Sequence, residues 1–118
     1  MSRTKNNEFH CAVEATLHVL GGKYKAIIIW KLSRYPVMRY GELQRAIPQA
    51  TAKMLTQQLK ELEADGIVVR TLYPVVPPRT EYQLSELGQT LVPIVNAMSS
   101  WGHGYFERLG IPDPSSEA

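Results

Sequence analysis

The spacing of apolar residues changes at Gly66, and this change constrains the fold more than any other feature of the chain. Before it, Leu55, Leu59 and Leu62 are separated by four and three positions, which is the period of one face of an α-helix. After it, the run IVVRTLY at 67–73 is rich in β-branched residues and is typical of a strand. A helix with one buried face must therefore be followed at once by a strand.

A hairpin is predicted to follow the same glycine. The segment RTEYQL at 79–84 is the predicted partner of the first strand, and PVVPP at 74–78 joins the two. Three prolines within five residues prevent ordinary ladder pairing and keep the connection extended. We therefore expect a stiff tip that projects from the body of the protein.

Helical spacing also indicates four further helices. They cover residues 11–20, 23–32, 41–47 and 86–109, and a brief extended segment at 37–40 lies between the second and the third. Breaking residues follow the first three, namely Gly21 and Gly22, then Pro36, then Pro48.

Two hydroxyl residues are predicted to cap helices. Thr51 stands before the helix at 52–65, and Ser85 stands before the long helix at 86–109. Pro93 inside the long helix lacks the N–H that would bond to Gln89, so we expect a bend there.

The resulting order of elements is helix, helix, short strand, helix, turn, helix, strand, proline-rich wing, strand and long helix. Two helices joined by the tight link PQAT occupy its middle. We predict a mainly α fold with a small β-hairpin, a winged helix-turn-helix, as one domain over residues 1–118. The core is expected at 11–110, and the tails 1–8 and 112–118 are expected to be flexible.

Composition excludes several classes of protein. The 118 residues are 44% hydrophobic, which suffices for one core without metals or disulfides. No apolar run reaches the length of a membrane span and the first residues do not resemble a signal peptide, so we expect a cytoplasmic protein without a membrane segment. Cys11 and the three histidines do not follow a metal-ligand spacing, so neither metal nor cofactor is predicted.

The chain also lacks a convincing set of nucleophile, base and orienting group, and it has no phosphate-binding glycine loop, so we predict that it is not an enzyme.

The charges of the chain are unevenly distributed along the sequence. Between residues 23 and 60 there are eight basic residues against one acid, Glu42, whereas one base and five acids occupy residues 81–118. This polarity indicates a basic working half, although chance segregation of solvated charges is the alternative.

The exposed face of the helix at 52–65 has the side chains for reading DNA. The second helix of such a pair enters the major groove. Lys53 and Lys60 can neutralise phosphates or reach guanine acceptors, while Gln57 and Gln58 can make two-pronged contacts to adenine, with Thr56 at the flank. The simpler interpretation is a solvated face of an amphipathic helix.

Further candidate contacts to phosphate lie outside this face, at Thr51, Arg39, Arg45 and Arg79. Arg79 is placed at the tip of the wing. Arg70, on the first strand, either meets the sugar-phosphate backbone or pairs with Glu81 within the sheet.

Three long motifs carry a resemblance to a known family. They are GGKYKAIIIWKL, RYGELQRAIPQATAKMLTQQLKELEADGIVVR and YPVVPPRTEYQLSELGQTLVPIV, followed by WG at 101–102, and together they extend over residues 11 to about 106. The chain resembles the HxlR-type transcriptional regulators, which are relatives of the MarR winged-helix proteins. The resemblance implies a homodimer that binds double-stranded DNA at a palindromic operator, with the N- and C-terminal helices building the dimer interface.

The long C-terminal helix supports this expectation by its own composition. Too little chain remains to bury its whole apolar stripe, so a partner chain must cover part of it. The interface is predicted to include Leu17, Leu91, Val95, Met98, Trp101 and Tyr105. An aromatic ligand box around Met98, Trp101 and Tyr105 is the alternative interpretation.

The resemblance also implies a sensor of oxidants, quinones or aldehydes at a cysteine near the N-terminus, a position that corresponds to Cys11. Many members have proline after this cysteine, whereas Ala12 follows here. A thiolate at a helix start is stabilised by the helix dipole, which lowers the thiol pKa, and a protonated His10 would add to this effect. The alternative is a small buried residue at the dimer seam.

Two other functions are kept as alternatives. One is a winged-helix module that binds proteins, whose signature would be acids in place of Lys53, Lys60 and Arg79, and these positions are basic. The other is a regulator switched by a small ligand without covalent chemistry.

Overall fold

The structure, a computed structural model, describes residues 8–114. Its elements are α1 (Ala12–Leu20), α2 (Lys25–Arg34), β1 (Met38–Arg39), α3 (Tyr40–Ala46), α4 (Ala52–Ala64), β2 (Val68–Tyr73), β3 (Arg79–Leu84), α5 (Glu86–Gln89) and α6 (Val92–Leu109). The predicted order of elements is confirmed. The outer parts of the two predicted tails, at 1–7 and 115–118, lie outside the described residues.

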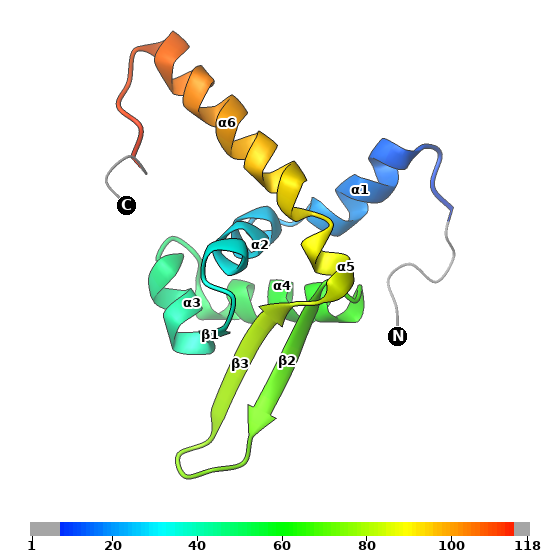
Figure 1. Ribbon diagram of the computed structural model, residues 1–118, viewed down its shortest axis with the longest axis vertical. Coiled ribbons are helices and arrows are strands. Elements are labelled where there is room, and N and C mark those ends of the chain that lie inside the picture. Colours follow the sequence, from blue (N-terminus) through cyan, green and yellow to red (C-terminus); the bar gives the residue numbers. More distant parts are fainter. Residues whose placement is uncertain (1–7, 115–118) are drawn as a thin grey trace.

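The helices surround one end of a small sheet, and a hairpin leaves the body at the other end (Figure 1). The sheet has the order β1-β3-β2 with antiparallel neighbours. Strand pairing runs from Val68 opposite Leu84 to Tyr73 opposite Arg79. Beyond that last pair, residues 74–78 form the projecting tip that their prolines predict.

The core lies between α2, α3, α4 and the near end of the sheet. The apolar stripe Leu55, Leu59 and Leu62 of α4 is buried, as predicted, and it packs in one cluster with α2 and α3. In α2, Ile28 and Leu32 are buried. Other members of the cluster are Tyr24, Ile29, Leu43, Ile47, Val68, Tyr82, Leu84, Leu91 and Val95.

Both predicted caps are present. The Thr51 hydroxyl accepts a hydrogen bond from the Met54 N–H at 3.1 Å at the start of α4. The Ser85 hydroxyl accepts one from the Gly88 N–H at 2.9 Å and donates to the Gly66 carbonyl at 2.6 Å. Ser85 therefore fixes the start of α5 against the turn that follows α4.

The predicted long helix at 86–109 is wrong in one respect, because the chain forms two helices there. α5 ends at Gln89, and α6 begins at Val92 with Pro93 in its first turn. A first-turn N–H has no partner within the helix, so the missing N–H of Pro93 costs nothing at this position. Pro93 therefore starts a helix and does not bend one.

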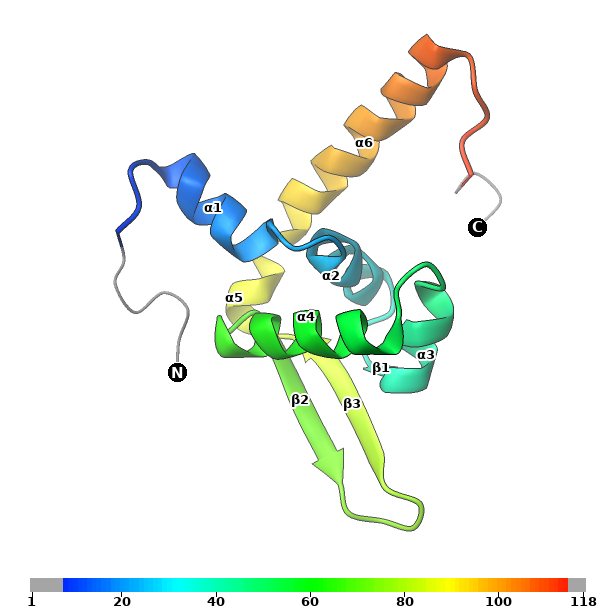
Figure 2. The same ribbon diagram turned by 180° about the vertical axis from the view of Figure 1, so that it is seen from behind.

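The two remaining terminal helices extend away from the body, α6 over 18 residues and α1 over 9 (Figures 1 and 2). No residue of α1 is buried, and Val95 is the one buried residue of α6. Among the described residues, no helix is long and apolar enough to cross a membrane.

We predict opposite effects for two glycine-to-alanine changes. A Cβ at Gly88 would lie 2.2 Å from the Ile67 carbonyl oxygen, so Gly88→Ala should lower the free energy of unfolding by about 1–3 kcal/mol. A Cβ at Gly104 in α6 has no neighbour within 4 Å, so Gly104→Ala should raise it by about 0.5–1 kcal/mol. Urea unfolding of both variants measures these changes, and a neutral Gly88→Ala would contradict the close packing of α5 on Ile67.

Candidate nucleic-acid interface

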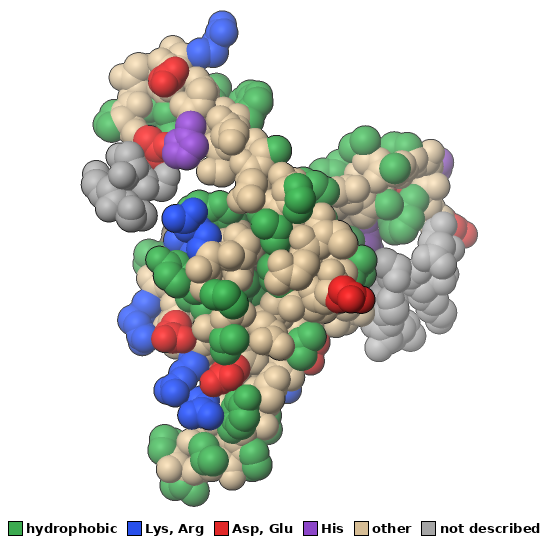
Figure 3. Space-filling model, in the orientation of Figure 1, with side chains coloured by type: hydrophobic (Ala, Val, Ile, Leu, Met, Phe, Trp, Pro, Cys, Tyr) green, Lys and Arg blue, Asp and Glu red, His purple; other side chains and the backbone are tan. Residues whose placement is uncertain are grey.

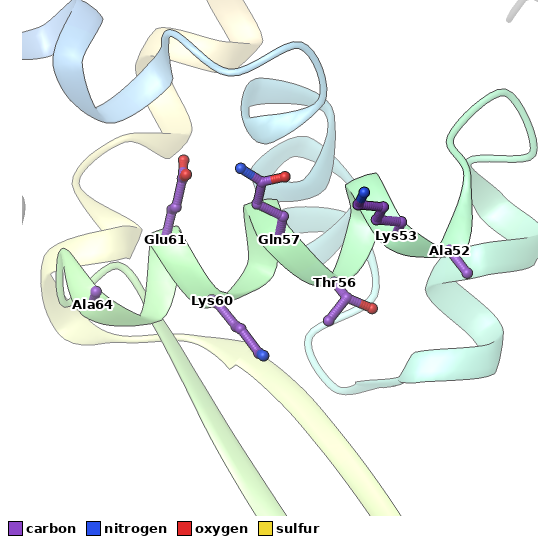
Figure 4. A pocket seen from close by; sticks show the side chains of 7 residues that line it. All are labelled: Ala52, Lys53, Thr56, Gln57, Lys60, Glu61 and Ala64. Atoms are coloured by element: carbon purple, nitrogen blue, oxygen red, sulfur yellow. The ribbon is translucent and has the colours of Figure 1, made fainter.

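The outer face of α4 is open and polar. Lys53, Gln57 and Lys60 are exposed and Thr56 is partly exposed. They line an open surface together with Ala52, Glu61 and Ala64 (Figure 4). Lys60 and Thr56 point toward the hairpin, whereas Gln57 points to the opposite side. Neither lysine forms an ion pair with the residues that the structure describes, so both cations are available to a ligand.

Gln58 does not belong to this face, and its predicted contact with DNA is wrong. Its side chain is only 8% exposed, and its Oε1 accepts a hydrogen bond from the Tyr24 N–H at 2.7 Å. Leu55, Gln58, Leu59 and Leu62 follow the spacing i, i+3, i+4, i+7 of a single helix face. That spacing was the signal for the inward orientation of Gln58.

A second polar contact on the inner side of α4 was not foreseen from the sequence. The Lys25 side chain is 1% exposed, and its Nζ lies 2.5 Å from Glu61 Oε1. Gly22 lies against the same pair of helices, because a Cβ there would be 2.8 Å from both Gln58 Oε1 and Lys25 Cε. Lys25 therefore holds α2 on α4 and adds nothing to the basic surface.

The end of α4 also meets α1. His18 Nε2 lies 3.8 Å from Asp65 Oδ1, and the Phe9 ring meets the His18 ring edge-on at 5.4 Å between centroids. This contact connects the helix that begins after Cys11 to the C-terminal end of α4. Acidic Glu63 and Asp65 also lie at this end, so the N-terminal half of α4 is the half suited to an anionic ligand.

Tyrosine hydroxyls fix the angle between α3 and α4. The Tyr40 hydroxyl donates to the Ala52 carbonyl at 3.2 Å and lies 3.1 Å from the Thr56 hydroxyl. The Tyr24 hydroxyl donates to the Gln49 carbonyl at 3.0 Å in the turn between the two helices. The helix-turn-helix unit is therefore held by side-chain hydrogen bonds as well as by its core.

The hairpin differs from the predicted wing in its charged residues. Arg79 begins β3 and does not lie at the tip, its guanidinium lies 4.6 Å from the centroid of the Tyr73 ring, and its Nε is 3.3 Å from Glu81 Oε2. Of the two alternatives for Arg70, the ion pair with Glu81 is absent from the described residues, where Glu81 pairs with Arg79. Residues 74–78 carry no charge, and the hairpin tip is hydrophobic (Figure 3).

The other predicted phosphate contacts lie at the surface. Thr51, Arg39 and Arg45 are exposed, and Arg39 precedes α3, where its N–H donates to Glu42 Oε1 at 2.8 Å. Basic and acidic side chains alternate along the edge that carries α3 and the base of the hairpin (Figure 3). This edge therefore carries local cationic positions and not a continuous basic patch.

The terminal helices present a separate apolar surface. Leu17, Met98, Trp101 and Tyr105 are 47–71% exposed, and the last two rings stack at 5.1 Å between centroids.

Two predicted interface residues behave differently, because Leu91 and Val95 are buried in the chain's own core, with 9% and 2% of their surface exposed. The prediction that they face a partner chain is wrong. They hold the start of α6 on the helical body.

Cys11 lies at the N-cap position of α1 and is exposed. Its carbonyl accepts a hydrogen bond from the Ala15 N–H at 3.2 Å. His10 beside it is engaged with Glu14, whose Oε1 lies 3.2 Å from His10 Nδ1 and also accepts the His10 N–H at 2.7 Å. The predicted position of Cys11 at a helix start is confirmed, whereas the alternative of a buried thiol does not hold within this chain.

A helix-turn-helix whose second helix keeps a cationic, hydrogen-bonding face open beside a projecting hairpin defines a winged helix-turn-helix DNA-binding protein. The model of the HxlR-like helix-turn-helix family matches residues 19–109, and the chain belongs to this family of transcriptional regulators.

Similar proteins are also described as regulators. YtcD of Bacillus subtilis (strain 168), an HTH-type transcriptional regulator, is 45% identical over 105 residues, which is 89% of this chain and 82% of YtcD. The redox regulator HypR in its reduced form has a TM-score of 0.79 at 47% identity, covering 85% of this chain and 98% of HypR. The reduced form of the transcriptional regulator YodB from B. subtilis has a TM-score of 0.67 at 33% identity, covering 79% and 91%.

We predict different outcomes for the two adjacent glutamines of α4. Gln58→Leu leaves the buried Tyr24 N–H without its acceptor and should lower the free energy of unfolding by about 1–3 kcal/mol. Gln57→Ala changes an exposed side chain and should alter it by no more than about 0.5 kcal/mol. Equal destabilisation by the two variants in urea unfolding would contradict the inward orientation of Gln58.

Proposed function

We propose that this regulator is a homodimer that binds a palindromic operator in double-stranded DNA, with α4 in the major groove of each half-site. The observation that carries the proposal is the outer face of α4, on which Lys53, Gln57 and Lys60 are exposed beside a projecting hairpin. A folded helix whose inner face is fully engaged and whose outer face offers donors without carboxylate partners fits the edges of bases. Such a regulator works in the cytoplasm, alongside the chromosome.

The proposed contacts divide into two groups. Gln57 and Lys53 lie in the N-terminal half of α4 and are assigned to base edges, Lys53 also being within reach of phosphate. The assigned phosphate contacts are Thr51, Lys60, Arg39 and Arg45. Arg79 and Thr56 are left out because Arg79 pairs with Glu81 and the Thr56 hydroxyl is bonded to that of Tyr40. Thr51 is the start of α4, where exposed amide groups favour an anion.

A second copy of the chain is the proposed occupant of the apolar surface on α1 and α6. The two helices extend from the body and carry large apolar side chains that are exposed to solvent, namely Leu17, Met98, Trp101 and Tyr105. Their burial between two chains would remove this exposed area and relate two α4 helices by a two-fold axis. Half-sites about 34–36 Å apart follow from that symmetry.

Cys11 is the proposed site of regulation by an oxidant, a quinone or an aldehyde. The exposed thiol lies at the start of α1, and α1 contacts the end of α4 through His18 and Asp65. A modification at Cys11 that moves α1 would therefore change the placement of α4. The solved regulators HypR and YodB support this proposal, since HypR is described as a redox regulator and YodB has a diamide-treated form.

Fluorescence anisotropy tests the function, with duplex DNA from upstream of the protein's own gene and adjacent genes, a scrambled duplex and a salt series. We expect dimer-stoichiometric binding that prefers the upstream DNA and weakens steeply with salt. Lys53→Ala should weaken binding and lower the slope of log K against log salt by about two, because one phosphate contact is lost in each half-site of the dimer. An unchanged slope removes Lys53 from the contacts, and equal weak binding to both duplexes contradicts an operator-binding function.

Cys11→Ser tests the regulation on the same duplex. Serine keeps the size of the side chain but lacks a reactive thiolate, so the variant should bind DNA as the wild type does and lose the response to diamide or quinones. A variant that still responds would place the effector elsewhere, as expected for a regulator with a non-covalent ligand.

A further inference from the structure

A polar notch lies in the angle between α4 and the hairpin. It has a volume of about 510 Å³, and Lys60 on α4 faces Arg70 on β2 and Thr80 on β3 across it. Figure 4 shows Lys60 pointing from α4 toward the strands. We name this the helix–hairpin notch.

Strand register decides which arginine of the hairpin reaches the notch. Arg70 lies opposite Tyr82 and Leu72 opposite Thr80, so these four residues share one face of the hairpin. Arg79 and Glu81 alternate with them and therefore lie on the other face, where they pair with each other. Arg70 thus faces α4, while the arginine that the sequence favoured for DNA contact is engaged elsewhere.

The cations in the notch are not neutralised by a carboxylate. Lys60 and Arg70 have no acidic side chain within 4.0 Å among residues 8–114. Burial raises the pKa of Tyr82 above its ordinary value, which the adjacent Arg70 opposes, so the phenol stays a neutral hydroxyl. Glu63 is the one acid that lines the notch, and its side chain is exposed to solvent.

Two hydrogen bonds of the Tyr40 hydroxyl hold side chains that line the notch. Tyr40 and Thr56 form its inner wall and are hydrogen-bonded to each other at 3.1 Å, with Tyr40 also bonded to the Ala52 carbonyl. Lys60, Arg70 and Thr80 therefore remain as its donors toward an incoming ligand. Two cations and a hydroxyl in one concave site are the donors that a phosphate requires.

We propose that the helix–hairpin notch binds one backbone phosphate of DNA in each half-site, with Arg70 and Lys60 as its two cationic ligands. This inference rests on the proposed function. When α4 lies in the major groove, the hairpin projects beside it, so the sugar-phosphate strand that bounds the groove on this side must pass between them. The notch is the place where that strand crosses the protein, and it fixes the insertion depth of α4.

Arg70→Gln tests the proposal against a matched control. Glutamine keeps a hydrogen-bonding side chain but removes the charge, so we expect roughly tenfold weaker operator binding and a salt slope lower by about two, one for each half-site. Arg34→Gln, on α2, removes the same charge from an exposed position away from the hairpin and should leave the slope unchanged. Glu63→Gln removes the acid that lines the notch and should strengthen binding. Thermal unfolding confirms that each variant is folded.

Neutral methylphosphonates, placed one at a time along the operator, locate the phosphate. At one position in each half-site the substitution should weaken binding of the wild type more than that of Arg70→Gln, because the variant has already lost one of the two cations that hold this phosphate and keeps only Lys60. If wild type and variant lose affinity at the same positions by the same factors, the notch does not hold a phosphate. If the wild type shows no preference for any upstream duplex, the proposed function itself fails.

Inorganic phosphate distinguishes a small ligand from DNA. In the absence of DNA and at constant ionic strength, phosphate should stabilise the wild type more than Arg70→Gln, because the same donors hold a free or an esterified phosphate. If this difference appears while both proteins bind the operator with the same affinity and salt slope, the notch belongs to a small phosphate compound and its assignment to DNA is overturned.

Discussion

The inner face of α4 is the contact on which the arrangement of this regulator depends. Its leucine stripe joins the core, and two polar residues on the same side bind the start of α2, Gln58 through the Tyr24 N–H and Glu61 through Lys25. A buried amide and a nearly buried ammonium are costly unless they have partners, so these contacts set the rotation of α4 about its axis. That rotation decides which side chains are left facing outward.

The charges that the protein can offer to a ligand are consequently those of basic side chains that are not already paired within the chain. Lys25 is buried and paired with Glu61, and Arg79 is paired with Glu81 in the hairpin. Lys53, Lys60 and Arg70 form no ion pair with the described residues, so their charges are available to a ligand. Counting basic residues along the chain therefore overstates the cationic surface and misplaces part of it. Three of the available cations thus belong to α4 and to the face of the hairpin turned toward it, which is the distribution expected where one strand of DNA passes between two elements.

Membership of the HxlR-like family establishes the chain as a transcriptional regulator, whereas the proposed dimer and the proposed thiol switch both involve the terminal helices. α1 and α6 share two properties: each keeps large apolar side chains in water, and each is attached to the body at one end only. α1 also carries the exposed Cys11 and contacts the end of α4. The proposed dimer surface and the proposed thiol switch thus share α1, so a modification of Cys11 that moves α1 would also alter the dimer surface.

By itself the sequence determined the order of the elements, the hairpin with its proline-rich tip, and the caps at Thr51 and Ser85. These features depend on residues a few positions apart, where period, hydrogen-bonding side chains and proline act locally. Helical spacing already places Gln58 on the inner face of α4, but only the tertiary structure supplied its partner and decided that Lys25 is buried and that Arg70 faces α4. The reason is physical: a buried polar side chain is held by its partner, and the Tyr24 N–H that Gln58 accepts from lies 34 residues away, where no local pattern can indicate it.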